Sequence, residues 1–241
     1  MADEVDTNAA IWKSDRGIDH WKATAEERER KRAEQRRLLA GLLPFADDEA
    51  FTFVDLGAGT GAAAGAVLER CPRARAFLAE YSPQMIAEGT RAHEKYRGRF
   101  TYVEFDLASG PWPAGIPDAV DAAITSMCFH HLPDRRKAEL FGEIRERLVP
   151  GGWFLNFDPV TAEDPVVDEV WQRTNRRLDL SETDEHAHRT PEEQARYANH
   201  VRFMSPLPRQ LEFLRNAGFE GIDVYWKQLD YVIYGGRRPV A

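Results

Sequence analysis

Three glycines crowd the turn that follows a short, mostly apolar segment near residue 55. Residues 51–56 predict a strand, and Gly57, Gly59 and Gly61 come directly after it. Residues 59–69 are rich in small side chains and predict a helix. Glycine adopts a positive φ at no steric cost and lets a ligand approach the backbone closely. The pattern therefore predicts a strand, a ligand-binding turn and a helix, placed at the carboxyl end of a parallel strand.

Strands and helices continue to alternate along the chain. Apolar runs predict four more strands, at residues 74–81, 100–105, 119–126 and 153–157. Ser82 and Asp134 are expected to cap helices between them, and the Pro-Gly-Gly at residues 150–152 predicts a turn. Residues 219–226 and 229–234 are joined too closely for a crossover, so they predict an antiparallel C-terminal hairpin. Together these segments predict an α/β protein with a doubly wound, mostly parallel seven-stranded sheet.

The expected organisation has four parts. They are an N-terminal helical lid segment, a core, a helical cap insertion and a completion of the core sheet, at residues 1–45, 46–160, 161–204 and 205–241. A capping box at Thr24 begins the charged lid helix. The regular pattern fails after the fifth strand, where residues 165–180 and 191–200 look helical. A further helix is expected from Ser205.

Composition and charge narrow the class of protein. The 241 residues, 43% of them hydrophobic, suffice for one large domain with a buried core. The net charge of −8 argues against a nucleic-acid partner, which needs a basic surface. The two cysteines lack metal-site spacing, and His186 and His188 have no further ligands at clear spacing, so we expect no metal. Without a signal peptide or an apolar run that spans a bilayer, we expect a cytoplasmic monomer or homodimer with no membrane contact.

The glycine turn alone fits two kinds of ligand. Gly57, Gly59 and Ala62 match the dinucleotide pattern G-x-G-x-x-G/A, and Glu80 stands about 20 residues further on, where that pattern has its ribose-binding carboxylate. An NAD-dependent oxidoreductase is therefore one hypothesis. The neighbouring segments favour another.

The wider sequence resembles the class I S-adenosylmethionine (SAM)-dependent methyltransferases. In this chain, VDLGAGTG at residues 54–61 resembles motif I of that family. Four later segments resemble the family's later motifs in the same order: LAEYSPQMI, VEFDLA, AAITSMCFHHLPD and LVPGGWFLNFD. The C-terminal hairpin is also that family's usual ending. The resemblance covers roughly residues 50–160 and 205–236 and implies a Rossmann-like sheet. It implies SAM as the cofactor and S-adenosylhomocysteine as its product.

The resemblance also implies how the cofactor is held. Glu80 would bind the ribose hydroxyls, Asp106 the adenine amine, and Leu107 would pack nearby. Asp55 either faces the amino group of SAM or caps loop amides. The complete set of expected cofactor contacts is Asp55, Gly57, Ala58, Gly59, Glu80, Tyr81, Met85, Asp106, Leu107, Ser126 and His131.

The methyl acceptor leaves weaker signals. His131 is the favoured general base, with Tyr234 as a second guess, and we interpret His130 as a packed turn residue. The expected substrate contacts are Trp21, Tyr197, Arg202 and Lys227. We predict an enzyme that methylates an oxygen or nitrogen of a small molecule. An RNA-modifying methyltransferase, an NAD-dependent oxidoreductase and a SAM-binding regulator without chemistry remain alternatives.

Overall fold

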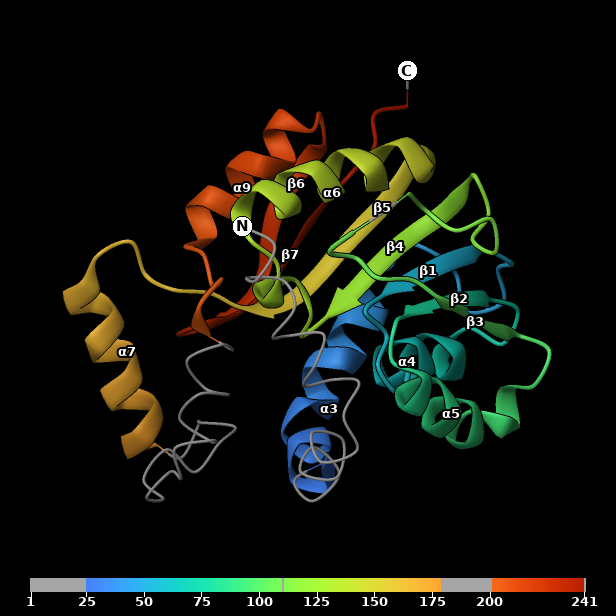
Figure 1. Cartoon of the computed structure of the whole chain (residues 1–241), viewed down its shortest axis with the longest axis horizontal. Coiled ribbons are helices and arrows are strands. Elements are labelled where there is room, and N and C mark those ends of the chain that lie inside the picture. Colours follow the sequence, from blue (N-terminus) through green and yellow to red (C-terminus); the bar gives the residue numbers. More distant parts are fainter. Residues whose placement is uncertain (1–24, 110, 179–200, 241) are drawn as a thin grey trace.

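A seven-stranded sheet forms the centre of the molecule (Figure 1). The computed structural model describes residues 25–109, 111–178 and 201–240, the first five of them by their backbone alone. The strand order is β3-β2-β1-β4-β5-β7-β6. The strands are β1 (Thr52–Leu56), β2 (Arg75–Glu80), β3 (Phe100–Glu104), β4 (Val120–Ser126), β5 (Leu148–Pro159), β6 (Glu220–Gln228) and β7 (Tyr231–Arg237). The first five pair in parallel, and β7 pairs antiparallel with both β5 and β6. The predicted doubly wound sheet with its antiparallel hairpin is confirmed.

Helices cover both faces of this sheet, as Figure 1 shows. They are α3 (Ala25–Leu42), α4 (Ala62–Arg70), α5 (Pro83–Ala92), α6 (Asp134–Arg147), α7 (Pro165–Arg177) and α9 (Leu207–Asn216), with short 3₁₀ turns η1 (Glu94–Tyr96) and η2 (Phe129–His131). On one face, apolar side chains of α6 and α9 pack on the sheet; on the other, those of α3 and α4 do. None of the helices within the described part of the chain is long and apolar enough to cross a membrane.

The C-terminal half of α3 belongs to the core. Leu39 and Leu43 are fully buried against α4. The guanidinium of Arg70 donates at 2.5 Å to the carbonyl of Ala40, which the end of the helix leaves without an intrahelical partner, and at 2.6 Å to the carbonyl of Phe45 in the loop that follows. The C-terminal half of the helix that we expected within a lid is thereby fixed beside the sheet, and its N-terminal half runs away from the sheet (Figure 1).

Local geometry moves several predicted boundaries. The helix expected from residue 59 begins at Ala62, because Gly59 and Gly61 adopt φ of 55° and 81°, which a right-handed helix excludes. Pro133 occupies the N-cap position that we assigned to Asp134. Residues 150–152 do not turn the chain but lie within β5, where Gly151 and Gly152 exchange hydrogen bonds with Arg238.

Two helices of the C-terminal half also differ from prediction. The helix expected from Ser205 begins at Leu207, because the chain at Pro206 forms a parallel bridge with Thr161. The predicted helix at residues 165–180 is α7, which ends at Arg177. The amide of Asn175 donates to Asp230 at 2.7 Å, so α7 rests on the β6–β7 hairpin. The helix predicted at residues 191–200 lies outside the described residues.

Candidate functional site

One cavity lies at the carboxyl ends of the parallel strands. Every residue that the sequence analysis assigned to a cofactor lines it: Asp55, Gly57, Ala58, Gly59, Glu80, Tyr81, Met85, Asp106, Leu107, Ser126 and His131. The parallel topology explains this convergence, because each of these residues stands on a strand or just after one, and those strand ends meet at one edge of the sheet.

The glycine loop forms the floor of the cavity. Gly57, Gly59 and Gly61 all have positive φ, of 67°, 55° and 81°. The amides of Gly57 and Ala58 both donate to the carbonyl of Ala79, at 2.9 and 3.0 Å, which ties the loop to β2. A Cβ on Gly57 would overlap the sulfur of Cys128, whereas a Cβ on Gly59 would meet nothing within 4 Å. The loop is therefore closed by protein at Gly57 and open to a ligand at Gly59.

Glu80 joins the glycine loop to the turn after β2. Its carboxylate accepts from the backbone amides of Gly59 at 2.8 Å, Tyr81 at 3.0 Å and Ser82 at 2.9 Å. Burial raises the pKa of this carboxyl, and the three backbone donors oppose that rise. A carboxylate offers about four acceptor positions, so a ligand hydroxyl in the cavity can still bind to this one.

Asp55 presents one oxygen without a partner. Its side chain is 1% exposed, and Oδ2 accepts from the amide of Ala64 at 3.1 Å, in the first turn of α4. Among the described residues Oδ1 has no hydrogen-bond partner. Burial raises the pKa of this carboxyl to about 7, although Arg36 nearby favours the charged form. Asp55 thus caps an amide, one of the two roles we kept open, and its second oxygen suits a cationic donor.

Apolar side chains line the cavity beside Asp106. The Asp106 carboxylate accepts from the amide of Ala108 at 2.9 Å and from the hydroxyl of Ser109 at 3.1 Å, which fixes the turn after β3. Met85, Phe105 and Leu107 are nearly fully buried and also line the cavity there. Apolar walls next to a carboxylate suit a planar ring with an amino group at its edge.

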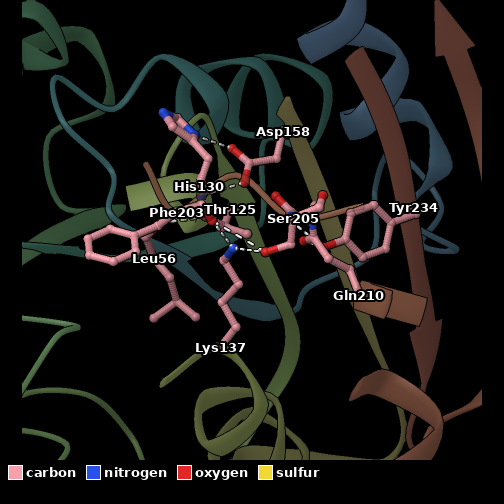
Figure 2. Close-up of polar contacts among 10 residues, drawn as sticks. Leu56, Thr125, His130, Lys137, Asp158, Phe203, Ser205, Gln210 and Tyr234 are labelled. Atoms are coloured by element: carbon pink, nitrogen blue, oxygen red, sulfur yellow. Dashed lines mark hydrogen bonds and ion pairs between the residues drawn. The ribbon is translucent and has the colours of Figure 1, made fainter. Parts of the chain in front are cut away.

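A buried pair holds the loop after β4. His130 is 1% exposed and donates to Asp158 through its backbone amide at 2.8 Å and its Nδ1 at 2.7 Å (Figure 2). It is a packed turn residue, in agreement with our interpretation. The ring of the next residue, His131, lies 3.9 Å from that of His130 between centroids and lines the cavity. Asp158 therefore holds the residue that precedes His131 in the same turn.

Several predicted residues lie elsewhere. The ammonium of Lys227 stands 3.9 Å from the centroid of the Trp171 ring and donates to the carbonyl of Leu229, and Lys227 is not among the cavity residues. Arg202 is exposed and lies over the Phe203 ring, outside the lining. Tyr234 is fully buried in the core, which excludes it as a base in the cavity. Trp21, Tyr197, His186 and His188 fall outside the described residues.

Sequence reasoning missed other residues of the cavity wall. They include Arg32, Arg36, Met127, Cys128, Leu132 and Pro133. Arg32 and Arg36 stand four residues apart on α3, so they share one helix face, a spacing that was visible in the sequence. The described part of the chain holds no group of three or more His, Cys, Asp or Glu suited to a metal ion.

Comparisons with known proteins agree with this architecture. Residues 53–152 match a family model described as a methyltransferase domain. A demethylmenaquinone methyltransferase of Thermus thermophilus is 35% identical over 108 residues, which cover 44% of this chain and 47% of that protein. The chain thus aligns with about half the length of the curated relatives it matches.

Solved structures share the fold at low identity. An O-methyltransferase family protein from Burkholderia thailandensis superposes with a TM-score of 0.69 at 19% identity, over 96% of this chain and 62% of that chain. Human N-acetylserotonin methyltransferase in complex with SAM gives 0.57 at 17% identity, over 91% of this chain and 57% of that chain.

Proposed function

We propose, from the class I SAM-dependent methyltransferase domain that this chain carries, that the protein transfers a methyl group from SAM to an oxygen or nitrogen of a small molecule. The observation that carries the proposal is a cavity that combines an open glycine loop with carboxylates from three neighbouring strands. Each of those groups matches one part of SAM.

The carboxylates fit the polar edges of such a ligand. Glu80 accepts a hydrogen bond from a ribose hydroxyl, because its three backbone partners leave about one acceptor position open. Asp106 receives the adenine amine beside its apolar walls. Asp55 receives the ammonium of the amino-acid tail on Oδ1, which accepts no hydrogen bond from the part of the chain that the structure describes. Arg32 and Arg36 supply the positive charge that suits the carboxylate of that tail.

Methyl transfer requires mainly that the protein align the acceptor atom with the methyl group. SAM supplies a methyl group on a sulfonium, whose departure as a neutral thioether makes the displacement favourable. The protein holds the acceptor atom in line with that methyl group and excludes water from it. His131, held in place beside the His130–Asp158 pair, accepts the proton that an acceptor hydroxyl loses as its oxygen forms the new bond to carbon.

A small acceptor agrees better with the charge of the protein than RNA does. With 40 acidic against 32 basic residues, the chain lacks the excess of positive charge that neutralises phosphates. A cytoplasmic location and a monomeric or homodimeric state remain predictions from the sequence.

Ligand-dependent stability tests the proposal against the oxidoreductase alternative. S-adenosylhomocysteine at about 100 times its dissociation constant should raise the free energy of unfolding by about 2.7 kcal/mol, seen as a rise in melting temperature. NAD at the same concentration should leave the melting temperature unchanged. Stabilisation by NAD and none by S-adenosylhomocysteine would refute the proposal.

A further inference from the structure

Lys137 is a fully buried lysine on α6. Its ammonium donates to the backbone carbonyl of Phe203 and, at 2.5 Å, to the hydroxyl of Ser205, and it lies 3.5 Å from the Asp134 carboxylate. Figure 2 shows the ammonium between the Phe203 and Ser205 segments. Removing an ammonium from water is unfavourable, and the loss is offset only when its donors find good partners. Here two of the three partners, the Phe203 carbonyl and the Ser205 hydroxyl, belong to one short stretch of chain.

That stretch is where the chain returns to the core after the segment at 161–204. Ser205 is 2% exposed, and its carbonyl accepts from the side chain of Gln210 at 3.1 Å and from the amide of Thr161 at 3.3 Å. The hydroxyl of Ser205 donates to Asp134. Lys137 therefore completes a polar anchor that fixes the backbone just after Phe203.

Phe203 is the side chain that this anchor places. It is half-buried and lines the cavity together with Leu132 and Pro133, which lead into α6. Leu132 and Pro133 follow β4, and the backbone of Phe203 is held by Lys137 of α6. Glu80 and Asp106 instead stand at the ends of β2 and β3, beyond β1 on the other side of β4. The carboxylates thus mark one half of the cavity, toward β2 and β3, which we call the polar half although Met85, Phe105 and Leu107 also line it; Phe203, Leu132 and Pro133 form an apolar wall toward α6.

We infer that Phe203 is a specificity-determining wall of the acceptor subsite, that Lys137 is the positioning residue that holds it there, and that the subsite takes a flat apolar acceptor. The inference rests on the proposed methyltransferase function, which assigns the polar half of the cavity to SAM. A flat aromatic acceptor gains contact area with Phe203, Leu132 and Pro133, and the Phe203 ring adds stacking. A highly charged acceptor would lose its hydration against the same side chains.

The test measures two affinities by titration calorimetry. The first is that of S-adenosylhomocysteine; the second is that of 2-naphthol, a flat apolar phenol, for the protein saturated with S-adenosylhomocysteine. Phe203→Ala and Lys137→Met should each weaken 2-naphthol about tenfold or more, while the affinity for S-adenosylhomocysteine changes less than about threefold. Arg135→Met is the matched control, because Arg135 is a cation on the same helix with a 90% exposed side chain. It should change neither affinity.

A double variant separates positioning from general destabilisation. If Lys137 acts through Phe203, Phe203→Ala combined with Lys137→Met binds 2-naphthol no more weakly than Phe203→Ala alone. Additive losses would overturn the positioning role. Ser205→Ala, which removes one acceptor of the ammonium, provides the same comparison if Lys137→Met does not fold.

The outcomes distinguish this inference from the proposed function. Failure of the wild type to bind S-adenosylhomocysteine would refute the function itself. Binding of S-adenosylhomocysteine without binding of 2-naphthol would overturn only the apolar acceptor subsite. An unchanged 2-naphthol affinity in Phe203→Ala would overturn only the role of Phe203.

Discussion

Lowering the pH from 8 to 6 is expected to weaken the binding of S-adenosylhomocysteine about tenfold, because a buried carboxyl must ionise to accept the ammonium of the ligand. Burial raises the pKa of Asp55 to about 7, and its Oδ1 lacks a hydrogen-bond partner among the described residues. Lowering the pH therefore protonates the carboxyl that we propose binds the ammonium of the ligand. It also acts in the range of pH where most proteins stay folded.

The magnitude follows from the ionised fraction of Asp55. With a pKa of about 7, about 90% of this carboxyl is ionised at pH 8 and about 10% at pH 6. A ligand that binds only the ionised form loses about tenfold in affinity between these values, which is about 1.4 kcal/mol. The contribution of Asp55 to the free energy of unfolding changes with pH in the opposite direction. Because the pKa is raised above its usual 3.8, the contribution of Asp55 to stability is greatest at low pH and falls as the pH rises toward 7.

Calorimetric titrations at pH 6, 7 and 8 measure the effect. Asp55→Asn should bind S-adenosylhomocysteine more weakly than the wild type at pH 8 and show no such slope, and it also controls for titration of the ligand's own amine. His131→Gln should keep the slope, because the proposal places the ammonium of the ligand at Asp55 and not at this imidazole. A wild-type affinity that is flat from pH 8 to 6, or a slope that persists in Asp55→Asn, would refute the reasoning.

Three further predictions concern the same cavity and its frame. Glu80→Gln should weaken S-adenosylhomocysteine by about 10- to 150-fold, since a hydrogen bond to a charged group contributes about 1.5–3 kcal/mol; calorimetry that finds less than a threefold loss would contradict the ribose assignment. Asp106→Ala should weaken the same ligand, and an unchanged affinity would exclude its contact with adenine. Gly235→Ala should lower the melting temperature sharply, because its Cβ would lie 2.0 Å from the carbonyl oxygen of Phe154. The matched control Gly142→Ala, on a helix where a Cβ meets nothing within 4 Å, should stabilise slightly.

The polar half of the cavity was predictable because each of its residues stands on or next to the end of a strand. Asp55, Glu80 and Asp106 lie far apart in sequence, yet the rule that parallel strands end at one edge is enough to place them together. The glycine loop could be predicted for a similar reason, since positive φ at three positions is a local requirement. Local sequence also determined the hairpin, whose short connection permits only antiparallel pairing.

The other half depended on packing between distant segments, which no local pattern encodes. Arg36 reaches the cavity because the Arg70 guanidinium and buried leucines dock α3 onto α4, and Phe203 does so because Lys137 anchors the chain beside it. Lys227 was expected at the substrate. Its ammonium instead lies over the ring of Trp171, because α7 rests on the β6–β7 hairpin that carries Lys227. The sequence by itself determined the sheet and the carboxylates at its edge, through periodicity and chain topology. Tertiary structure alone decided which side chains close the cavity, because that choice depends on contacts between residues that are remote along the chain.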